Sequence, residues 1–169
     1  MSAGPGGGAR DSEGGARKAE GGARKAEGGA PDAGHAARDA ITRLRGDPPS
    51  LYEERFGFSR VLRLGALVFV GGTTSVDGDG VVQGKTPYEQ TVVALEKIGH
   101  ELERAGAAPA DVVLTRVYVT DISRAEEVGR AHGEALGEVR PLMTMVEVSA
   151  LIDPRMLVEI EAMAVVGAR

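Results

Sequence analysis

Two acidic residues near the C-terminal end of the chain alternate with apolar ones. Glu159 and Glu161 are separated by Ile160 and flanked by Val158 and Ala162. Side chains of a β-strand alternate between its two faces, so both carboxylates are expected on one face and the apolar residues on the other. Burial in a cleft raises the pKa of a carboxyl into the range useful for proton transfer. The segment therefore predicts a strand that carries two carboxylates capable of acid–base chemistry.

The segment before this strand carries a second pattern. Residues 140–148 read RPLMTMVEV, in which Pro141, Thr144 and Glu147 are spaced three apart, and residues 69–72 read FVGG. With the acidic strand, these motifs resemble the RidA family, also called YjgF, whose best-studied members hydrolyse enamines and imines. The resemblance covers roughly residues 52–166 and is most specific in the C-terminal strands.

The resemblance implies a role for Glu159 and a departure at Met143. Glu159 corresponds to the family's cleft glutamate, which holds the water that attacks an imine carbon. The alternative is a strand glutamate paired with an arginine across a subunit interface. Active members have an arginine that clamps the substrate carboxylate two residues after the proline, where this chain has Met143. Because a thioether cannot make charge-assisted hydrogen bonds, the ligand either lacks a carboxylate there or finds its positive charge elsewhere.

Arg116 is the candidate for that positive charge. By the strand period it shares a face with Tyr118, although an interface arginine paired with a nearby glutamate is the alternative. Met143 and Met145 lie on one face of their own strand and would form a soft apolar wall.

Phe58 and the residues that follow Val70 complete the expected ligand-binding set. Phe58 stands where active relatives tend to have a tyrosine, and it keeps the ring while losing the hydroxyl. Gly71, Gly72 and Thr73 would present backbone N–H groups to an anionic ligand, as the family places a ligand-contacting loop here. The alternative for a glycine pair after a strand is a bulge or a tight turn.

Composition excludes several classes of function. The 169 residues carry a net charge of −5, which argues against nucleic acid as a partner, and contain no cysteine. The three histidines lack metal-ligand spacing, so neither a metal nor another cofactor is expected. Without a membrane-length apolar run or a secretory signal, we expect a cytoplasmic protein with no membrane contact.

The first part of the chain differs from the rest. A seven-residue unit, EGGARKA, begins at Glu13 and again at Glu20. Paired glycines and a lack of large apolar residues predict a disordered low-complexity tail over residues 1–39. Residues 40–169 are expected to form a single domain of the RidA type.

Strand and helix signals alternate through this domain. The helix signals are Thr86 as N-cap, Pro87 after it and Gly106 beyond the end, and then Ser123 as N-cap of a helix over residues 123–136. Strands are predicted over residues 41–45, 59–64, 66–70, 111–120 and two C-terminal segments. The order predicts an α+β domain with two helices on one face of a sheet of about six strands. Several strands are apolar on both faces, so other subunits are expected to cover the second face.

The resemblance gives these elements a fold and an assembly. It implies the chorismate-mutase-like fold and a barrel-like homotrimer with a cleft at each subunit boundary. The resulting hypothesis is a protein that binds a small metabolite in those clefts and hydrolyses reactive imines or enamines, as 2-iminobutanoate/2-iminopropanoate deaminases do. The alternative is a binding protein without catalysis, because Met143 replaces the clamping arginine. Ribonuclease and chorismate-mutase activities fit less well, because both need clustered basic residues.

Overall fold

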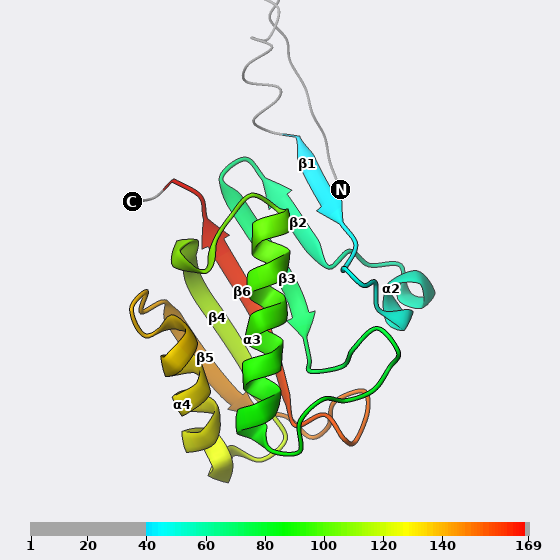
Figure 1. Ribbon diagram of the computed structural model, residues 1–169, viewed down its shortest axis with the longest axis vertical. Coiled ribbons are helices and arrows are strands. Elements are labelled where there is room, and N and C mark those ends of the chain that lie inside the picture. The colour runs from blue at the N-terminus through cyan, green and yellow to red at the C-terminus, as the bar shows by residue number, and fades with distance from the viewer. Residues whose placement is uncertain (1–39, 168–169) are drawn as a thin grey trace, which may run out of the picture. The chain divides into compact units, whose positions relative to one another are not determined.

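A six-stranded mixed β-sheet forms the centre of the protein (Figure 1). The computed structural model describes residues 40–167, so the tail expected over residues 1–39 lies outside the described residues. The strands lie in the order β1-β2-β3-β6-β4-β5. They are β1 (Ile41–Leu44), β2 (Val61–Leu64), β3 (Leu67–Thr73), β4 (Val112–Val119), β5 (Leu142–Glu147) and β6 (Val158–Val165).

Only one neighbouring pair of these strands is parallel. β5 runs parallel to β4, whereas every other pairing is antiparallel. The last strand, β6, lies between β3 and β4, so it occupies the middle of the sheet. This position surrounds Glu159 and Glu161 with neighbouring strands on both sides.

Two long helices cover one face of the sheet, as predicted (Figure 1). They are α3 (Pro87–Arg104), which packs against β3 and β6, and α4 (Ala125–Leu136), which packs against α3. The predicted start of α3 is confirmed, because Thr86 and Glu89 form a reciprocal capping box. Gly106 follows the helix with a φ of 75°, a conformation that favours glycine.

Two local predictions were wrong. The prediction of two helices omitted a third, α2 (Leu51–Phe56), whose N-cap Ser50 forms a capping box with Glu53. Ser123 does not cap α4, because it lies in a 3₁₀ turn where its amide donates to Asp121 Oδ1. Asp121 caps this 3₁₀ turn, and α4 begins after Arg124 without a side-chain cap.

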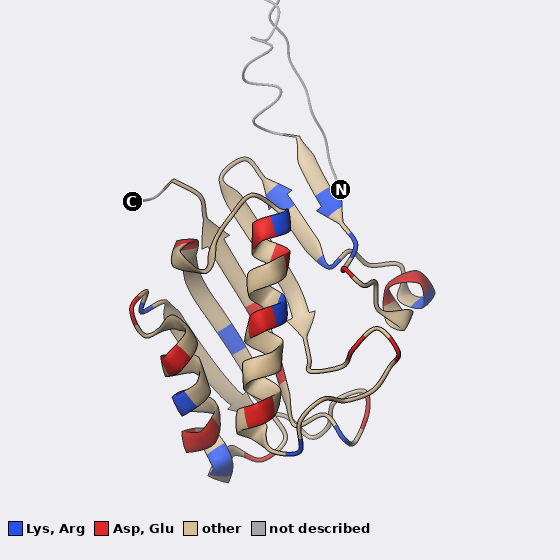
Figure 2. Cartoon of the chain, viewed as in Figure 1, with Lys and Arg blue, Asp and Glu red and all other residues tan. Residues whose placement is uncertain are grey.

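The two faces of the sheet have different surroundings. The helix-covered face holds the core, which includes Val117, Val158, Ile160 and Ala164. The other face, called the open face below, has no covering element among residues 40–167. Figure 2 shows that charged residues gather on the helices and loops, while the central strands carry few.

Candidate functional site

The sheet register places four polar residues together on the open face. Tyr118 is opposite Glu159, and Arg116 is opposite Glu161, across the β4–β6 pair. Nη1 of Arg116 lies 3.3 Å from Oε2 of Glu161, and 56% of the arginine side chain is exposed. Arg116 is therefore held by a carboxylate within its own chain, which matches the alternative considered for it from the sequence.

Glu159 occupies a more enclosed position than Glu161. Its side chain lies against the backbone of Gly72, where a Cβ atom would collide with Oε1 and come within 3.0 Å of Cδ. Burial raises the pKa of the Glu159 carboxyl; Arg60 opposes this shift, and Glu161 reinforces it. A carboxylate in this state can accept a proton from a bound water molecule.

Arg60 links the surroundings of Glu159 and was not identified from the sequence. Its Nη1 donates a hydrogen bond to the Gly72 carbonyl, and its Nε lies 3.5 Å from Oε1 of Glu53. The guanidinium carbon also lies 5.5 Å from the centre of the Phe58 ring. Arg60, rather than Arg116, thus supplies the positive charge that acts on Glu159. A lone arginine before an apolar strand gives little sequence signal, because most such residues are exposed.

The glycine pair forms a bulge. The β3–β6 register shifts between Val70 and Thr73, and the Gly71 amide donates to the Arg60 carbonyl at 2.9 Å. The Thr73 hydroxyl donates to the Gly71 carbonyl at 2.8 Å. The Gly71 amide is therefore already used, and the bulge instead brings Gly72 beneath Glu159.

The two methionines lie on the opposite side of the sheet from Glu159 within one chain. Met143 pairs with Thr115 and Met145 with Val117, and the side chains of Thr115 and Val117 face the helices. Met145 packs against the core, whereas Met143 is partly exposed at the edge strand β5. The structure thus brings Gly72 against Glu159 and Phe58 beside Arg60, but leaves Met143 and Met145 apart from Glu159.

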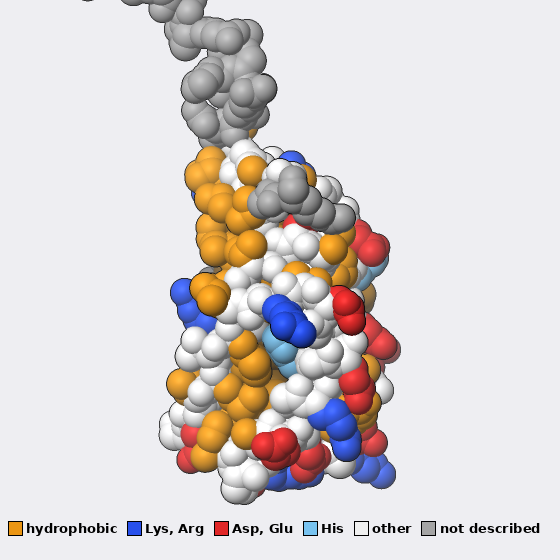
Figure 3. All heavy atoms as spheres, turned by 90° about the vertical axis from the view of Figure 1, so that its left-hand side faces the viewer, with side chains coloured by type: hydrophobic (Ala, Val, Ile, Leu, Met, Phe, Trp, Pro, Cys, Tyr) orange, Lys and Arg blue, Asp and Glu red, His pale blue; other side chains and the backbone are white. Residues whose placement is uncertain are grey.

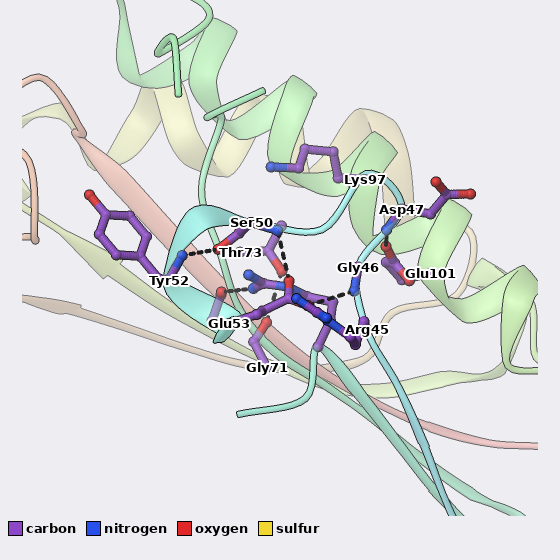
Figure 4. Close-up of polar contacts among 12 residues, drawn as sticks. Arg45, Gly46, Asp47, Ser50, Tyr52, Glu53, Gly71, Thr73, Lys97 and Glu101 are labelled. Atoms are coloured by element: carbon purple, nitrogen blue, oxygen red, sulfur yellow. Dashed lines mark hydrogen bonds and ion pairs between the residues drawn. The ribbon is translucent and has the colours of Figure 1, made fainter. Parts of the chain in front are cut away.

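A second group of polar residues gathers behind Arg60, on the α2 side of the sheet (Figure 4). Glu53 is fully buried and accepts hydrogen bonds from the amides of Gly46 at 2.9 Å and Ser50 at 3.1 Å. Glu101 on α3 accepts a hydrogen bond from the Asp47 amide at 2.9 Å. These two carboxylates hold the loop from β1 to α2 against the sheet and α3.

Residues 40–167 contain neither a metal-binding cluster of side chains nor a membrane-spanning helix. No group of three or more histidine, cysteine or acidic side chains there is arranged to bind a metal ion. Within the same residues, no helix combines the length and apolar character needed to span a bilayer.

Comparison with known proteins gives a consistent result. Residues 52–166 match the profile of a family described as Endoribonuclease L-PSP. An uncharacterized protein from Streptomyces coelicolor is 38% identical over 130 residues, which span 77% of this chain and 96% of that protein. A RutC family protein from Saccharolobus solfataricus is 34% identical over 109 residues, spanning 63% of this chain and 85% of that protein.

A solved structure extends the match to the fold. A member of the YjgF/YER057c/UK114 family from Mycobacterium tuberculosis is 48% identical and superposes with a TM-score of 0.68. The match covers 75% of this chain and the full length of that one.

Proposed function

Because the chain belongs to the Endoribonuclease L-PSP family, also called RidA/YjgF, we propose that it binds a small metabolite at Glu159 and hydrolyses a reactive imine or enamine there. The observation that carries the proposal is the state of Glu159. This carboxylate lies on the open face against Gly72, and burial raises its pKa. These are the properties of a general base at a partly desolvated site.

The proposed reaction needs only water as co-reactant. Glu159 accepts a proton from a water molecule whose oxygen bonds to the imine carbon, and the imine nitrogen takes up a proton. In the resulting tetrahedral intermediate, Glu159 passes its proton to the amino nitrogen. The hydroxyl group then loses its proton to Glu159 or solvent as the carbonyl forms, the C–N bond breaks and ammonia leaves, and any proton left on Glu159 returns to solvent, which replaces the one taken up by the imine nitrogen.

A second subunit would complete this site. The open face exposes large apolar side chains on several strands, among them Phe69 on β3 and Leu142 and Val146 on β5. Figure 3 shows such side chains gathered on the side of the molecule that includes the β5 edge. An apolar sheet face of this kind is typical of a surface buried in an oligomer. We propose a homotrimer whose neighbouring chain covers the open face and walls the cleft at Glu159.

The test is the rate at which the full chain hydrolyses a freshly generated 2-imino acid. Replacing Glu159 with glutamine keeps the shape of the side chain and removes the base, so the rate should fall about 100-fold or more. Glu161→Gln is the matched control, because it alters the neighbouring carboxylate of the same strand. Equal rates for wild type and Glu159→Gln, after subtraction of the uncatalysed reaction, would rule out Glu159 as the base.

Met143 supports a second candidate, a binding protein without catalysis. It stands where a clamping arginine is expected, and no ion pair among residues 40–167 brings another cation to β5. The Met143→Arg variant separates the two candidates: hydrolysis that appears from a zero baseline would indicate a binding protein whose activity was lost. Ile152→Arg is the control, because Ile152 is exposed in the loop between β5 and β6 and does not lie on the sheet.

A further inference from the structure

A cavity of about 400 Å³ lies on the helix side of the sheet, away from the open face. It is bounded by α3, by the loop from β1 to α2 and by the loop that follows β3. Ser50, Arg60, Ser75 and Lys97 are among its lining residues. A volume of this size falls in the lower range of small-molecule sites in proteins.

Ser75 is one of the lining residues and carries an unsatisfied hydroxyl. The residue is completely buried, and its Oγ has no hydrogen-bond partner among residues 40–167. Leaving a buried hydroxyl unpaired is costly, so such an atom is usually satisfied by a molecule that the protein binds.

Lys97 brings a second donor to the same cavity. Its Nζ donates to the carbonyls of Thr74 at 2.8 Å and Val76 at 2.5 Å, on either side of Ser75. An ammonium has three N–H donors, so one is left for a ligand. Burial lowers the pKa of the Lys97 ammonium and the neighbouring Arg60 lowers it further, while Asp77, Glu101 and Glu53 act in the opposite direction without cancelling the shift. An acceptor that carries negative charge would offset both effects.

The two buried carboxylates at the cavity, Glu53 and Glu101, do not fill this need, because their oxygens are already used. Both oxygens of Glu53 accept backbone N–H groups, from Ser50 and Gly46. Glu101 uses one oxygen for the Asp47 amide and the other for Arg104, at 2.6 Å. Figure 4 shows the bonds of Glu53 and the bond between Asp47 and Glu101, with Lys97 extending from α3 beside the same loop. Asp77 accepts hydrogen bonds from Asp79, Val81 and Gln83, and the other two acidic lining residues, Asp47 and Glu96, are exposed. The buried wall of the cavity therefore has more free donors than acceptors.

We propose that this cavity binds a small monocarboxylate, whose oxygens accept hydrogen bonds from the Ser75 hydroxyl and the Lys97 ammonium, with Arg60 adding positive charge. A single negative charge fits better than two, because Glu53 and Glu101 lie at the same cavity. The site differs from the one proposed at Glu159, which lies on the open face. Arg60 borders both, through the Gly72 carbonyl on one side and the cavity on the other.

Propanoate is a suitable probe, titrated into the full ¹⁵N-labelled chain at ionic strength held constant with sodium chloride. The amide resonances of Ser75, Val76 and Lys97 should shift saturably. Lys97→Met should weaken binding about tenfold or more, and Ser75→Ala by about fivefold. Lys85→Met is the matched control, since Lys85 is an exposed lysine that does not line the cavity. Glu159→Gln should leave the binding unchanged, which separates this site from the proposed catalytic one.

Several outcomes would overturn the proposal. Shifts that never saturate, that sodium chloride reproduces, or that persist in Lys97→Met would show that the cavity does not bind the carboxylate. Equal binding of the neutral analogue propanamide would remove the role of charge, and tighter binding of inorganic phosphate would contradict the preference for one charge.

Ser75→Ala provides a check that does not depend on Lys97 variants folding normally. Without ligand, removing an unpaired hydroxyl should leave the melting temperature unchanged or raise it, whereas saturating propanoate should stabilise the wild type more than the variant. A lower melting temperature for the unliganded variant would mean that the hydroxyl already has a partner, and would overturn the assignment.

Discussion

Gly72 lies directly against the carboxylate of Glu159, so that no Cβ atom fits at this position without displacing that side chain. Gly72→Ala should therefore move Glu159 off its position while leaving its charge intact. We expect the hydrolysis rate to fall about as far as in Glu159→Gln, because a displaced base loses its alignment with water. The measurement is the rate with a freshly generated 2-imino acid for both variants.

Gly71→Ala is the control for this prediction. A Cβ on Gly71 would meet its nearest atom, the Arg60 carbonyl oxygen, at 3.5 Å, which is ordinary contact. Gly71→Ala should therefore retain most of the activity. If both alanine variants lose activity equally, the cause is the bulge itself and not the contact with Glu159.

The raised pKa of Glu159 predicts a pH-dependent stability difference. Between the ordinary pKa of 4.5 and the raised value, the folded protein keeps a proton that the unfolded chain has lost. Stability from this group is therefore complete below the ordinary pKa and falls as the pH rises through the raised one. Glu159→Gln should melt above the wild type at pH 7, and the difference should vanish on acidification to about pH 4.

Glu54→Gln makes the same change of charge at an exposed position on α2. The difference in melting temperature between Glu159→Gln and this control isolates the effect of burial. A difference that stays constant from pH 4 to pH 7 would contradict the raised pKa.

The sequence predicted most elements of the fold because their local signals agree with their packing. Helix α3 has its capping box, its proline and its glycine stop where the pattern places them. Helix α2 was not predicted because it has only 6 residues, too few to show a helical pattern of apolar residues. Ser50 and Glu53 nevertheless carry the same capping signal that marks the start of α3. Short helices depend on tertiary contacts, here the burial of Glu53 against Arg60, which no local pattern reveals.

The candidate site was harder to predict for a related reason. The alternation of side chains predicted which face of its strand each of Glu159 and Tyr118 occupies. The β4–β6 register then places the two residues opposite each other. The alternation could not reveal that Arg60 reaches Gly72, because this contact depends on the bulge in β3 and on how the loop before β2 turns. The alternation of side chains also predicted that Met143 and Met145 share a face. The pairing of β5 with β4 shows that this face is the helix-covered one.

The apolar residues of the open face predict how the protein assembles. Phe69 lies in β3 with 38% of its surface exposed, opposite Met163 of β6. Phe69→Lys should leave the single chain folded and dissociate the trimer, because a lysine cannot be buried there without a partner. Sedimentation at micromolar concentration should show a trimer for wild type and a smaller species for the variant.

Ile152→Lys is the control for assembly, since Ile152 is exposed in the loop between β5 and β6 rather than on the sheet. It should sediment like the wild type. A wild-type protein that sediments as a monomer would refute the assembly and, with it, the cleft proposed between subunits.

Replacing Glu53 is expected to lower the stability of the fold strongly, although no proposed ligand binds directly to this residue. Its carboxylate is fully buried, accepts two backbone N–H groups and lies 3.5 Å from Nε of Arg60. Glu53→Gln keeps the shape but places an amide group toward one of these donors and leaves Arg60 without its counter-charge. We expect the free energy of unfolding to fall by about 2–4 kcal/mol.

The neighbouring Glu54 separates this effect from the loss of one surface charge. Glu54 has 81% of its side chain exposed and, among residues 40–167, forms an ion pair with Arg45 alone, at 3.1 Å. Exposed pairs of this kind contribute little, so Glu54→Gln should change the unfolding free energy by less than about 1 kcal/mol. Urea denaturation of both variants measures the contrast. Equal losses would mean that the buried carboxylate does not hold the loop from β1 to α2, and that Arg60 keeps its position beside Gly72 without it.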